Sequence, residues 1–414
     1  HAAGFLKIEE ITTPQHITAW YVHDENVPVV ALHFSLFGGA QMDDTGKEGT
    51  AEILSTLLDE GTTTQDAESF QNDLDRYGIK LRFGNGHDYF TGAIKTTTTF
   101  QDKAFVLLDK ALNTPRFAPE AIERMRQGLL SQQRFLVEDP NWIAGTELFA
   151  LLFPDHPYGR VIEGTPESLK AITRDDIVRM KDNLFCRGRL TVAVVGSLDK
   201  QQAAQSIDRV FGNWPECSTA ERRPQITLPE KGLVKHIKRA GAQSVLVMAQ
   251  QGLARQDPDW WAARILDFAL GGGEFSSRLM SEIRVKRGYT YGIDSSLAPY
   301  RYAQIWLVQA GLDPKHRDDA IALVQKIWSD VTQQGLTKEE IKEAKAYLIG
   351  SMPLALTTTD QIASVLLQLQ QDGLPMDTLD RREAEINAVT MDDIKRVAAK
   401  RLNADSLSVV TVGP

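Results

Sequence analysis

The sequence has little cysteine, since Cys186 and Cys217 are the only two among 414 residues. Two cysteines are too few for a disulfide framework, and their spacing matches no metal-binding or redox motif. We therefore expect two inert thiols. A Cys186–Cys217 disulfide, in an oxidising compartment, stays open as the alternative.

Long apolar runs are also missing, because no stretch reaches the about 18 residues that identify a transmembrane helix. Hydrophobic residues make up 42% of the chain and charged residues 24%, which is typical of a globular protein with a sizeable core. The formal net charge of -9 argues against nucleic acid as the main partner. The composition therefore predicts a folded globular protein with no membrane span.

Histidine pairs at metal-binding spacing are absent as well. The chain has 8 histidines, and no two of them stand three, four or five residues apart. A catalytic zinc site needs about three protein ligands, and its helical motifs supply two of them from histidines at such a spacing. The sequence therefore offers no histidine pair for zinc.

The region 48–60 does have the pattern of an amphipathic helix. At about 100° per residue, positions 52, 55, 56 and 59 share one face, opposite an apolar face. The polar face holds no imidazole and no thiolate, and consists of Glu48, Glu52, Ser55, Thr56 and Asp59. We interpret it as a solvated acidic face. A hard-cation site is the alternative, although such sites need more oxygen ligands than one helix offers.

An internal repeat at an offset of about 210 residues organises the chain. Each copy begins with a buried strand and a helix, and continues with a second helix that ends at a glycine. Strand-like runs, an amphipathic helix and a helix with acidic first-turn residues come next, and a helix and a short strand close each copy. The paired segments are 29–36 and 244–249, 48–60 and 260–270, 69–77 and 277–286, 80–96 and 289–311, 101–113 and 316–333, and 190–196 and 407–413. This order predicts two copies of one α+β unit.

The two copies are joined by a stretch, 213–235, that contains Pro215, Pro224 and Pro229 and a charged middle. Such a composition is typical of an interdomain linker. We therefore predict a first repeat at 1–215, a linker at 216–232 and a second repeat at 233–414.

The segment 49–62 resembles the metal-binding helix of the pitrilysin/insulinase zinc peptidases. That family carries an inverted motif in the frame Gly-x-Ala-His-x-x-Glu-His-x-Leu-x-x-Gly-Thr. Here the two histidine positions hold Glu52 and Thr56, and the general-base position holds Ser55. The resemblance therefore identifies degenerate metal-site positions that lack every group the chemistry needs.

The third ligand of the family, a glutamate on a later helix, is also replaced. Ser131, Gln132 and Gln133 occupy the neighbourhood where that carboxylate is expected, and Glu123 and Glu138 fall outside its register. The resemblance implies that this chain holds no metal of its own, and that zinc belongs to a partner subunit.

The resemblance extends over about 380 residues, through the segments 156–160, 164–169, 172–177, 270–279 and 282–291. Each segment is a weak signal alone, and their ordered succession is a strong one. The family fold implies an α+β class with two tandem, structurally similar repeats. Each repeat is then a mostly antiparallel sheet covered by helices.

In active members of that family, an arginine and a tyrosine seven residues later reach the zinc site from the second repeat. Arg284 and Tyr291 match this pair in spacing and frame, which implies that they bind peptide carbonyls and the developing oxyanion. Alternatively, Arg284 is a cation at a helix C-terminus and Tyr291 packs in a sheet. Tyr289 shares the strand face of Tyr291 and stays open as its substitute.

The glycines at 271–273 suggest a phosphate-binding loop, but the Gly-Lys-Ser/Thr ending of a P-loop is missing. We therefore expect a plain turn between two helices. The resemblance offers a substrate-facing loop as the alternative.

The resemblance implies a non-catalytic subunit of a heteromeric zinc metallopeptidase, inactive alone. It would close a peptide-binding chamber and lend Arg284 and Tyr291 to the active site of a His-x-x-Glu-His-bearing partner. Its other ligand would be a peptide or unfolded polypeptide, held as an added strand at a sheet edge. A metal-free structural scaffold and an autonomous metallopeptidase with atypical ligands stay open as alternatives, as does a homodimer in isolation.

Bacterial proteins of this type are usually exported, and the sequence begins with His1 instead of Met. Both points favour the periplasm of a Gram-negative bacterium, after removal of an N-terminal leader, over the cytoplasm.

Overall fold

The computed structural model describes residues 6–217 and 223–414. They form two compact units. The first unit comprises the described residues within 1–134, 160–222 and 353–380, and the second comprises 135–159, 223–352 and 381–414.

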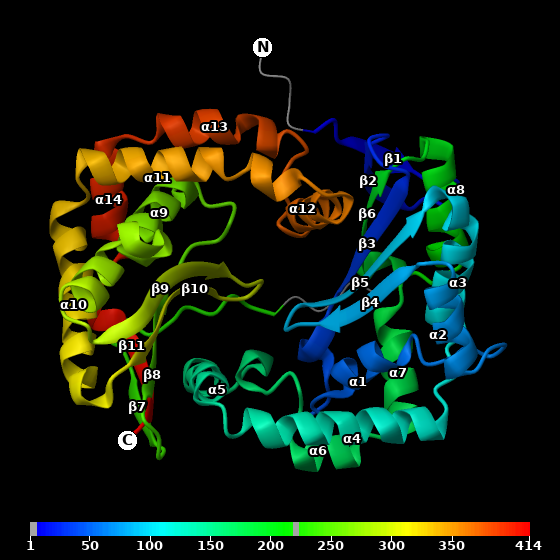
Figure 1. The fold of residues 1–414 in the computed structure, drawn as a ribbon, viewed down its shortest axis with the longest axis horizontal. Helices are drawn as coiled ribbons and strands as arrows, with labels where there is room; N and C mark the ends of the chain where they lie inside the picture. The colour runs from blue at the N-terminus through cyan, green and yellow to red at the C-terminus, as the bar shows by residue number, and fades with distance from the viewer. Residues whose placement is uncertain (1–5, 218–222) are drawn as a thin grey trace. The chain divides into compact units, whose positions relative to one another are not determined.

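The first unit is built on a sheet with the strand order β1-β2-β6-β3-β5-β4 (Figure 1). Its strands are β1 (Glu9–Thr12), β2 (Thr18–His23), β3 (Val29–Phe37), β4 (Lys80–Asn85), β5 (Tyr89–Thr97) and β6 (Leu190–Gly196). Only the β2–β6 pair is parallel, and the other neighbours are antiparallel. The central strand β3 is almost continuously apolar and buried, as expected for a strand covered on both faces.

The second unit repeats this arrangement with the order β7-β11-β8-β10-β9. Its strands are β7 (Val234–Lys238), β8 (Ser244–Gln251), β9 (Thr290–Pro299), β10 (Gln304–Leu312) and β11 (Ser408–Gly413). Again one pair, β7–β11, is parallel. The order matches β2-β6-β3-β5-β4 strand for strand, so the predicted α+β class with two similar, mostly antiparallel repeats is confirmed.

Helices cover both sheets. The first unit holds α1 (Thr50–Leu57), α2 (Ala67–Arg76), α3 (Gln101–Asn113), most of α4 (Pro119–Leu136), α6 (Pro166–Ala171), α7 (Arg174–Leu184), α8 (Lys200–Phe211) and α12 (Thr359–Gln371). The second holds α5 (Pro140–Leu152), α9 (Trp260–Asp267), α10 (Arg317–Gln334), α11 (Lys338–Gly350), most of α13 (Thr378–Ala388) and α14 (Met391–Arg401). Threonine capping boxes fix the starts of α6, α7, α11, α12 and α14.

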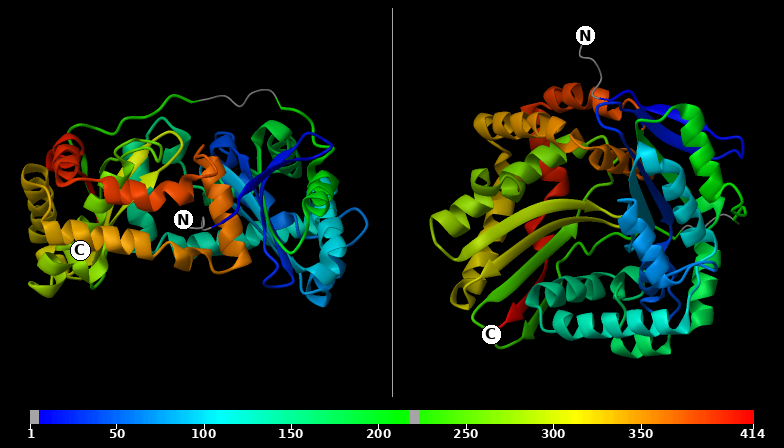
Figure 2. Two further views of the ribbon diagram at one scale, coloured as in Figure 1. Left: turned by 90° about the horizontal axis from the view of Figure 1, so that it is seen from above. Right: turned by 45° about the vertical axis from the view of Figure 1, so that its right-hand side comes forward.

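Each compact unit contains one helix from the other half of the sequence. Helix α5 packs on β8 and β11 in the second unit, and α12 packs on β3 and β6 in the first (Figures 1 and 2). The compact units therefore differ from the sequence halves by one exchanged segment in each direction. The boundaries 1–215, 216–232 and 233–414 stay a prediction about the repeats.

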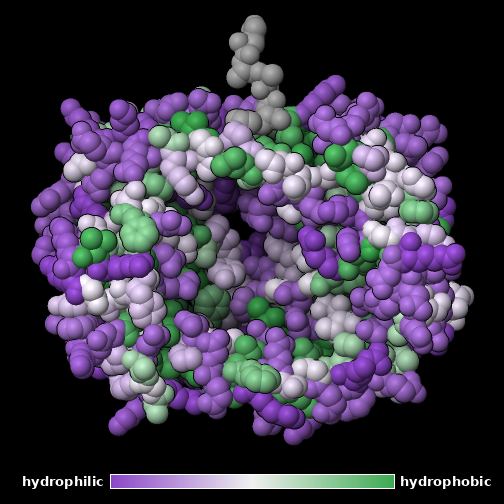
Figure 3. Space-filling view, viewed as in Figure 1, coloured by the Kyte–Doolittle hydropathy of each residue, from purple (hydrophilic) through white to green (hydrophobic). Residues whose placement is uncertain are grey.

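The two cores are built around large buried aromatic residues. Phe34 meets Phe211 edge to face in the first core, with ring centroids 5.2 Å apart. Trp306 and Trp328 do the same in the second, at 5.9 Å. On the face seen in Figure 3, hydrophilic residues dominate and hydrophobic residues form small separate groups. Among the residues described, no helix is both long enough and apolar enough to cross a membrane.

Cys186 and Cys217 form a disulfide, with 5.4 Å between their Cα atoms. The expectation of two inert thiols is therefore wrong, because the chain returns after α8 to the turn that precedes β6. Arg187 supports this return by donating from Nε to the Trp214 carbonyl, at 2.9 Å. The predicted linker stretch 213–235 also overlaps β7, which begins at Val234, and its residues 218–222 lie outside the described part.

Candidate functional site

The degenerate metal helix α1 begins at Thr50, later than the predicted position 48. Asp43 caps it from outside, because its two carboxylate oxygens accept from the backbone N–H groups of Gly49 and Ala51, each at 2.9 Å. Gly49 has a φ of 97°, and a Cβ there would lie 2.9 Å from the Leu169 side chain. Burial raises the pKa of Asp43 to about 7, although both N–H donors favour its charged form.

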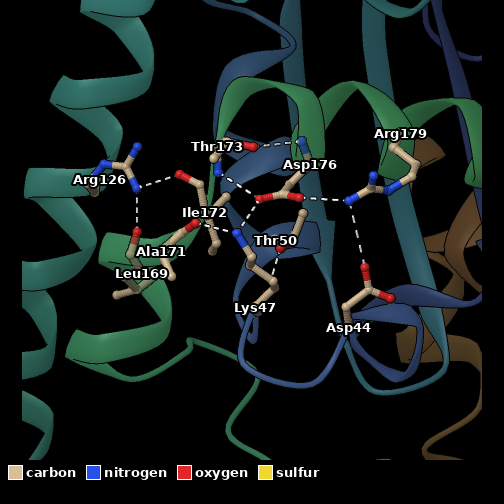
Figure 4. Close-up of polar contacts among 10 residues, drawn as sticks. All are labelled: Asp44, Lys47, Thr50, Arg126, Leu169, Ala171, Ile172, Thr173, Asp176 and Arg179. Carbon is tan, nitrogen blue, oxygen red and sulfur yellow. Dashed lines mark hydrogen bonds and ion pairs between the residues drawn. The ribbon is translucent and has the colours of Figure 1, made fainter.

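The loop that leads into α1 is anchored to α7 by a polar network (Figure 4). The Lys47 ammonium lies 2.8 Å from Asp176, which also accepts from the backbone N–H of Thr173 at 2.8 Å and from Arg179 at 2.7 Å. Burial opposes ionisation of Asp176, but Lys47 and Thr173 outweigh it and lower the pKa to about 2. The Thr50 hydroxyl completes the link by donating to the Lys47 carbonyl, at 2.6 Å.

The polar face of α1 is mostly buried. None of its members is exposed, and Ser55 is only 8% exposed. The Ser55 hydroxyl donates to the Glu52 carbonyl at 2.6 Å, and the Thr56 hydroxyl donates to the Ile53 carbonyl at 2.7 Å. The predicted solvated face is therefore wrong. Both hydroxyls turn back to their own helix, as serine and threonine commonly do in helices.

Glu52 keeps its proton to a higher pH than an ordinary glutamate. Burial raises its pKa to about 7, the nearby Glu163 carboxylate adds to the rise, and Asn85 opposes it. Within 6–217 and 223–414, no group of three or more His, Cys, Asp or Glu side chains could hold a metal ion. The residues at these positions therefore do not fit the zinc of the family motif.

The third-ligand region of α4 is structural in the same way. Ser131 and Gln132 are exposed, whereas Gln133 is buried and donates to the Gly164 carbonyl. This bond ties α4 to the loop before α6. Glu123 is exposed and pairs with Arg126 at 3.1 Å.

Arg284 lies in a π-helix, Met280–Val285, where the sequence predicts an ordinary helix over 277–286. Its guanidinium carbon is 5.0 Å from the ring centroid of Phe275, which is 61% exposed. In the described part of the chain, the guanidinium makes no hydrogen bond or ion pair. Arg284 therefore keeps its donors available while its guanidinium lies beside an exposed aromatic ring.

Tyr291 is the extra residue of a β-bulge on β9, an edge strand of the second sheet. Its neighbours Thr290 and Gly292 pair with Leu312 and Gly311, so Tyr291 has no residue opposite it. The Thr290 hydroxyl bridges the bulge by donating to the Gly292 carbonyl, at 2.7 Å. Tyr291 is 52% exposed, and its phenol makes no hydrogen bond among the residues described.

No hydrogen bond joins Arg284 to Tyr291 within the described chain. Both belong to the second unit, but their predicted common role stays a prediction. Tyr289 is engaged differently, because its ring stacks on His316 with centroids 4.1 Å apart.

The glycines at 271–273 do not form a plain turn. Helix α9 continues into a second π-helix, Phe268–Gly272. A Cβ on Gly271 would lie 2.6 Å from the Ser295 amide nitrogen, and one on Gly272 would lie 2.8 Å from an Asp267 carboxylate oxygen. Close packing against β9 therefore requires glycine here, which the sequence pattern does not reveal.

The structural roles of Asp43 and His33 were not predicted from the sequence. Asp43 gives no motif, because it caps α1 from outside the usual N-cap position. His33 is a single histidine in an apolar strand. Its partners Asp360 and Ser364 stand 327 and 331 residues later in the sequence. No local signal could have brought these residues together.

Comparison with known proteins agrees with this geometry. Residues 171–348 match the family model described as Peptidase M16 inactive domain. The chain is 25% identical over 393 residues to the non-peptidase homolog YmxG of Helicobacter pylori, covering 92% of this chain and 87% of that protein. It is 27% identical over 383 residues to an uncharacterized zinc protease of Streptomyces coelicolor, covering 90% and 82%.

Solved structures show the same fold. A peptidase M16 inactive domain from Pseudomonas fluorescens has a TM-score of 0.93 at 24% identity, with 99% of this chain and 98% of that chain covered. A protease from Helicobacter pylori has a TM-score of 0.87 at 19% identity, with coverages of 99% and 100%. Over residues 171–348 the chain therefore matches the inactive domain of the M16 peptidases, it shares the fold of such a domain, and it lacks the His-x-x-Glu-His residues of the pitrilysin/insulinase peptidases.

Proposed function

We propose that the chain is the non-catalytic subunit of a heteromeric zinc metallopeptidase. It closes a peptide-binding chamber with a His-x-x-Glu-His-bearing partner and lends Arg284 and Tyr291 to that partner's active site. Zinc belongs to the partner, because Glu52, Ser55 and Thr56 of this chain do not fit it. A peptide or unfolded polypeptide is the substrate.

The observation that carries this proposal is the presentation of Tyr291. A β-bulge leaves this residue without a partner opposite it, and bulges commonly re-aim side chains at functional sites. The residue is 52% exposed and its phenol has no hydrogen-bond partner among the described residues, so the phenol is available to donate to an oxyanion. Because β9 is an edge strand, its free backbone groups can also pair with an extended peptide.

The test is to mix the chain with a His-x-x-Glu-His subunit from the same organism. Light scattering after gel filtration reports heterodimer formation, and a quenched fluorescent peptide reports turnover. We expect activity from the mixture and none from this chain alone. Arg284→Ala should lower turnover with the heterodimer intact.

Arg287→Ala is the matched control, because Arg287 is exposed near the same helix end and its guanidinium pairs with Glu282 at 3.0 Å. Equal turnover in wild type and Arg284→Ala would assign this chain the role of a metal-free scaffold. An active partner that never binds this chain would refute the proposal.

We further propose a periplasmic location in a Gram-negative bacterium. The Cys186–Cys217 disulfide supports it, since disulfides persist in oxidising compartments and are rare in the cytosol. Thiol alkylation of protein taken directly from cells tests this proposal. Protection of both cysteines in a periplasmic extract is expected, and two free thiols in the cytosolic fraction would contradict it.

A further inference from the structure

A cavity of about 300 Å³ lies in the first compact unit, between α12 and the face of strands β3, β5 and β4. We call it the α12 cavity. Its polar lining consists of His33, Arg82, Thr91, Ser364, Gln368 and Gln371. Phe83 and Leu367 line it with apolar side chains. None of the degenerate metal-site positions lines it.

One wall of the α12 cavity has a fixed hydrogen-bond direction. His33 is 3% exposed, and its Nε2 lies 3.0 Å from Asp360, whose other oxygen lies 3.0 Å from the Lys95 ammonium. Burial lowers the pKa of His33 although its hydrogen bond to Asp360 opposes this, so the ring is neutral near pH 7. A neutral ring that donates from Nε2 to a carboxylate leaves Nδ1 as an acceptor.

The Ser364 hydroxyl lies 3.3 Å from His33 Nδ1 and therefore donates its proton there. Its lone pairs remain for a hydrogen bond from a ligand. Ser364 is exposed and lines the cavity. This wall consequently offers an acceptor to a hydrogen-bond donor such as an amide N–H.

The strand side of the cavity also carries a positive charge. Arg82 on β4 pairs with Ala93 on β5, which pairs with His33 on β3, so the three side chains share one face of the sheet. Across the described residues, no ion pair or hydrogen bond engages the Arg82 guanidinium. Lys95, on the same face, is already neutralised by Asp360. Arg82 is therefore available for an anion, and its fork of donors matches a carboxylate.

We propose that the α12 cavity binds the carboxyl-terminal end of a peptide or an N-acyl amino acid. Arg82 takes the carboxylate, and the Ser364 oxygen accepts from the adjoining amide N–H. The terminal side chain lies against Phe83 and Leu367. The site goes beyond the proposed peptidase role, because it lies within one unit of this chain and needs no partner.

The test uses the purified chain and a fluorescein-labelled hexapeptide that ends in leucine, read by fluorescence polarisation. The free acid should bind at least tenfold more tightly than the same peptide with a terminal amide. N-acetyl-leucine should displace it, and decanoate, which has no N–H, should do so at least tenfold less well. Equal displacement by decanoate would overturn the role of Ser364.

Arg82→Gln should weaken binding of the free acid at least tenfold and leave binding of the amide unchanged. Arg209→Gln removes the same charge from α8 and should change neither. Ser364→Leu fills the cavity from an exposed helix position and should abolish binding of the labelled free acid. Equal binding of acid and amide, or wild-type affinity in Arg82→Gln, would refute the proposal. Thermal melts followed by circular dichroism confirm that each variant is folded.

Discussion

Glu52 shows how a metal-ligand position is converted into a structural one. A half-buried carboxylate beside Glu163 keeps its proton to about pH 7. The folded pKa is raised above the ordinary 4.5, so the folded state binds more protons than the unfolded state between these two values. Stability should therefore fall as pH rises through this window, and the loss remains above it.

Glu52→Gln removes this penalty. We expect the free energy of unfolding to rise by about 3 kcal/mol at pH 8 and to change little at pH 4, because each pKa unit corresponds to about 1.4 kcal/mol. Urea denaturation at both pH values measures the difference. Glu123→Gln, at an exposed carboxylate, should show no such gain. An equal effect of Glu52→Gln at both pH values would contradict this account.

Asp176 has the opposite sign, because its folded pKa of about 2 lies below the ordinary 3.8. Its contribution is complete well above pH 3.8 and is lost as pH falls through the folded pKa. We expect Asp176→Asn to lower stability by about 2 kcal/mol at pH 7 and by about half as much at pH 3. Asp182→Asn, an exposed position on the same helix, is the control. A loss that does not shrink with falling pH would refute the assigned cause.

At the scale of elements, apolar periodicity predicts the repeat well. The bounds of α3 and β6 agree with the predicted 101–113 and 190–196. The π-helix Phe268–Gly272 was not predictable, because Gly271 packs closely against Ser295 of β9, far away in sequence. The packing of α5 in the second unit and of α12 in the first could not be predicted either. An amphipathic pattern shows which helix face is buried but not which sheet buries it.

We expect the Cys186–Cys217 disulfide to stabilise the fold. It closes a loop with a sequence separation of 31, and cross-linking such a loop stabilises the fold by about 3 kcal/mol through the unfolded state. The double substitution Cys186→Ser and Cys217→Ser should lower the free energy of unfolding by that amount with an unchanged circular dichroism spectrum. A reducing agent should destabilise the wild type and not the variant. Equal sensitivity of both proteins would contradict a native disulfide.

At the scale of the whole molecule, the family match accounts for the fold, and the residues at the site account for the lost chemistry. The loss of the metal ligands could be predicted, because the residues around each replaced position still match the family motif. The burial of this site could not be predicted, because Asn85 and Glu163 come to α1 from separate segments. The α12 cavity could not be predicted for the same reason, because its lining residues come from distant segments of the sequence.

Because the metal ligands are replaced, we expect the chain to bind no zinc. Metal analysis of the purified protein should find no stoichiometric zinc. The double substitution Glu52→His and Thr56→His should not create peptidase activity, because Ser55 cannot act as a general base and Gln133 is bound to Gly164. About one tightly held zinc per wild-type chain would contradict this.

The most direct measurement is the turnover number of the reconstituted heterodimer with Tyr291→Phe in this chain. Loss of an oxyanion donor predicts a fall of about a hundredfold, with zinc content and heterodimer formation unchanged. Tyr347→Phe, which removes another exposed phenol from the same unit, should keep wild-type turnover. Wild-type turnover in Tyr291→Phe would contradict the claim that this chain completes its partner's active site.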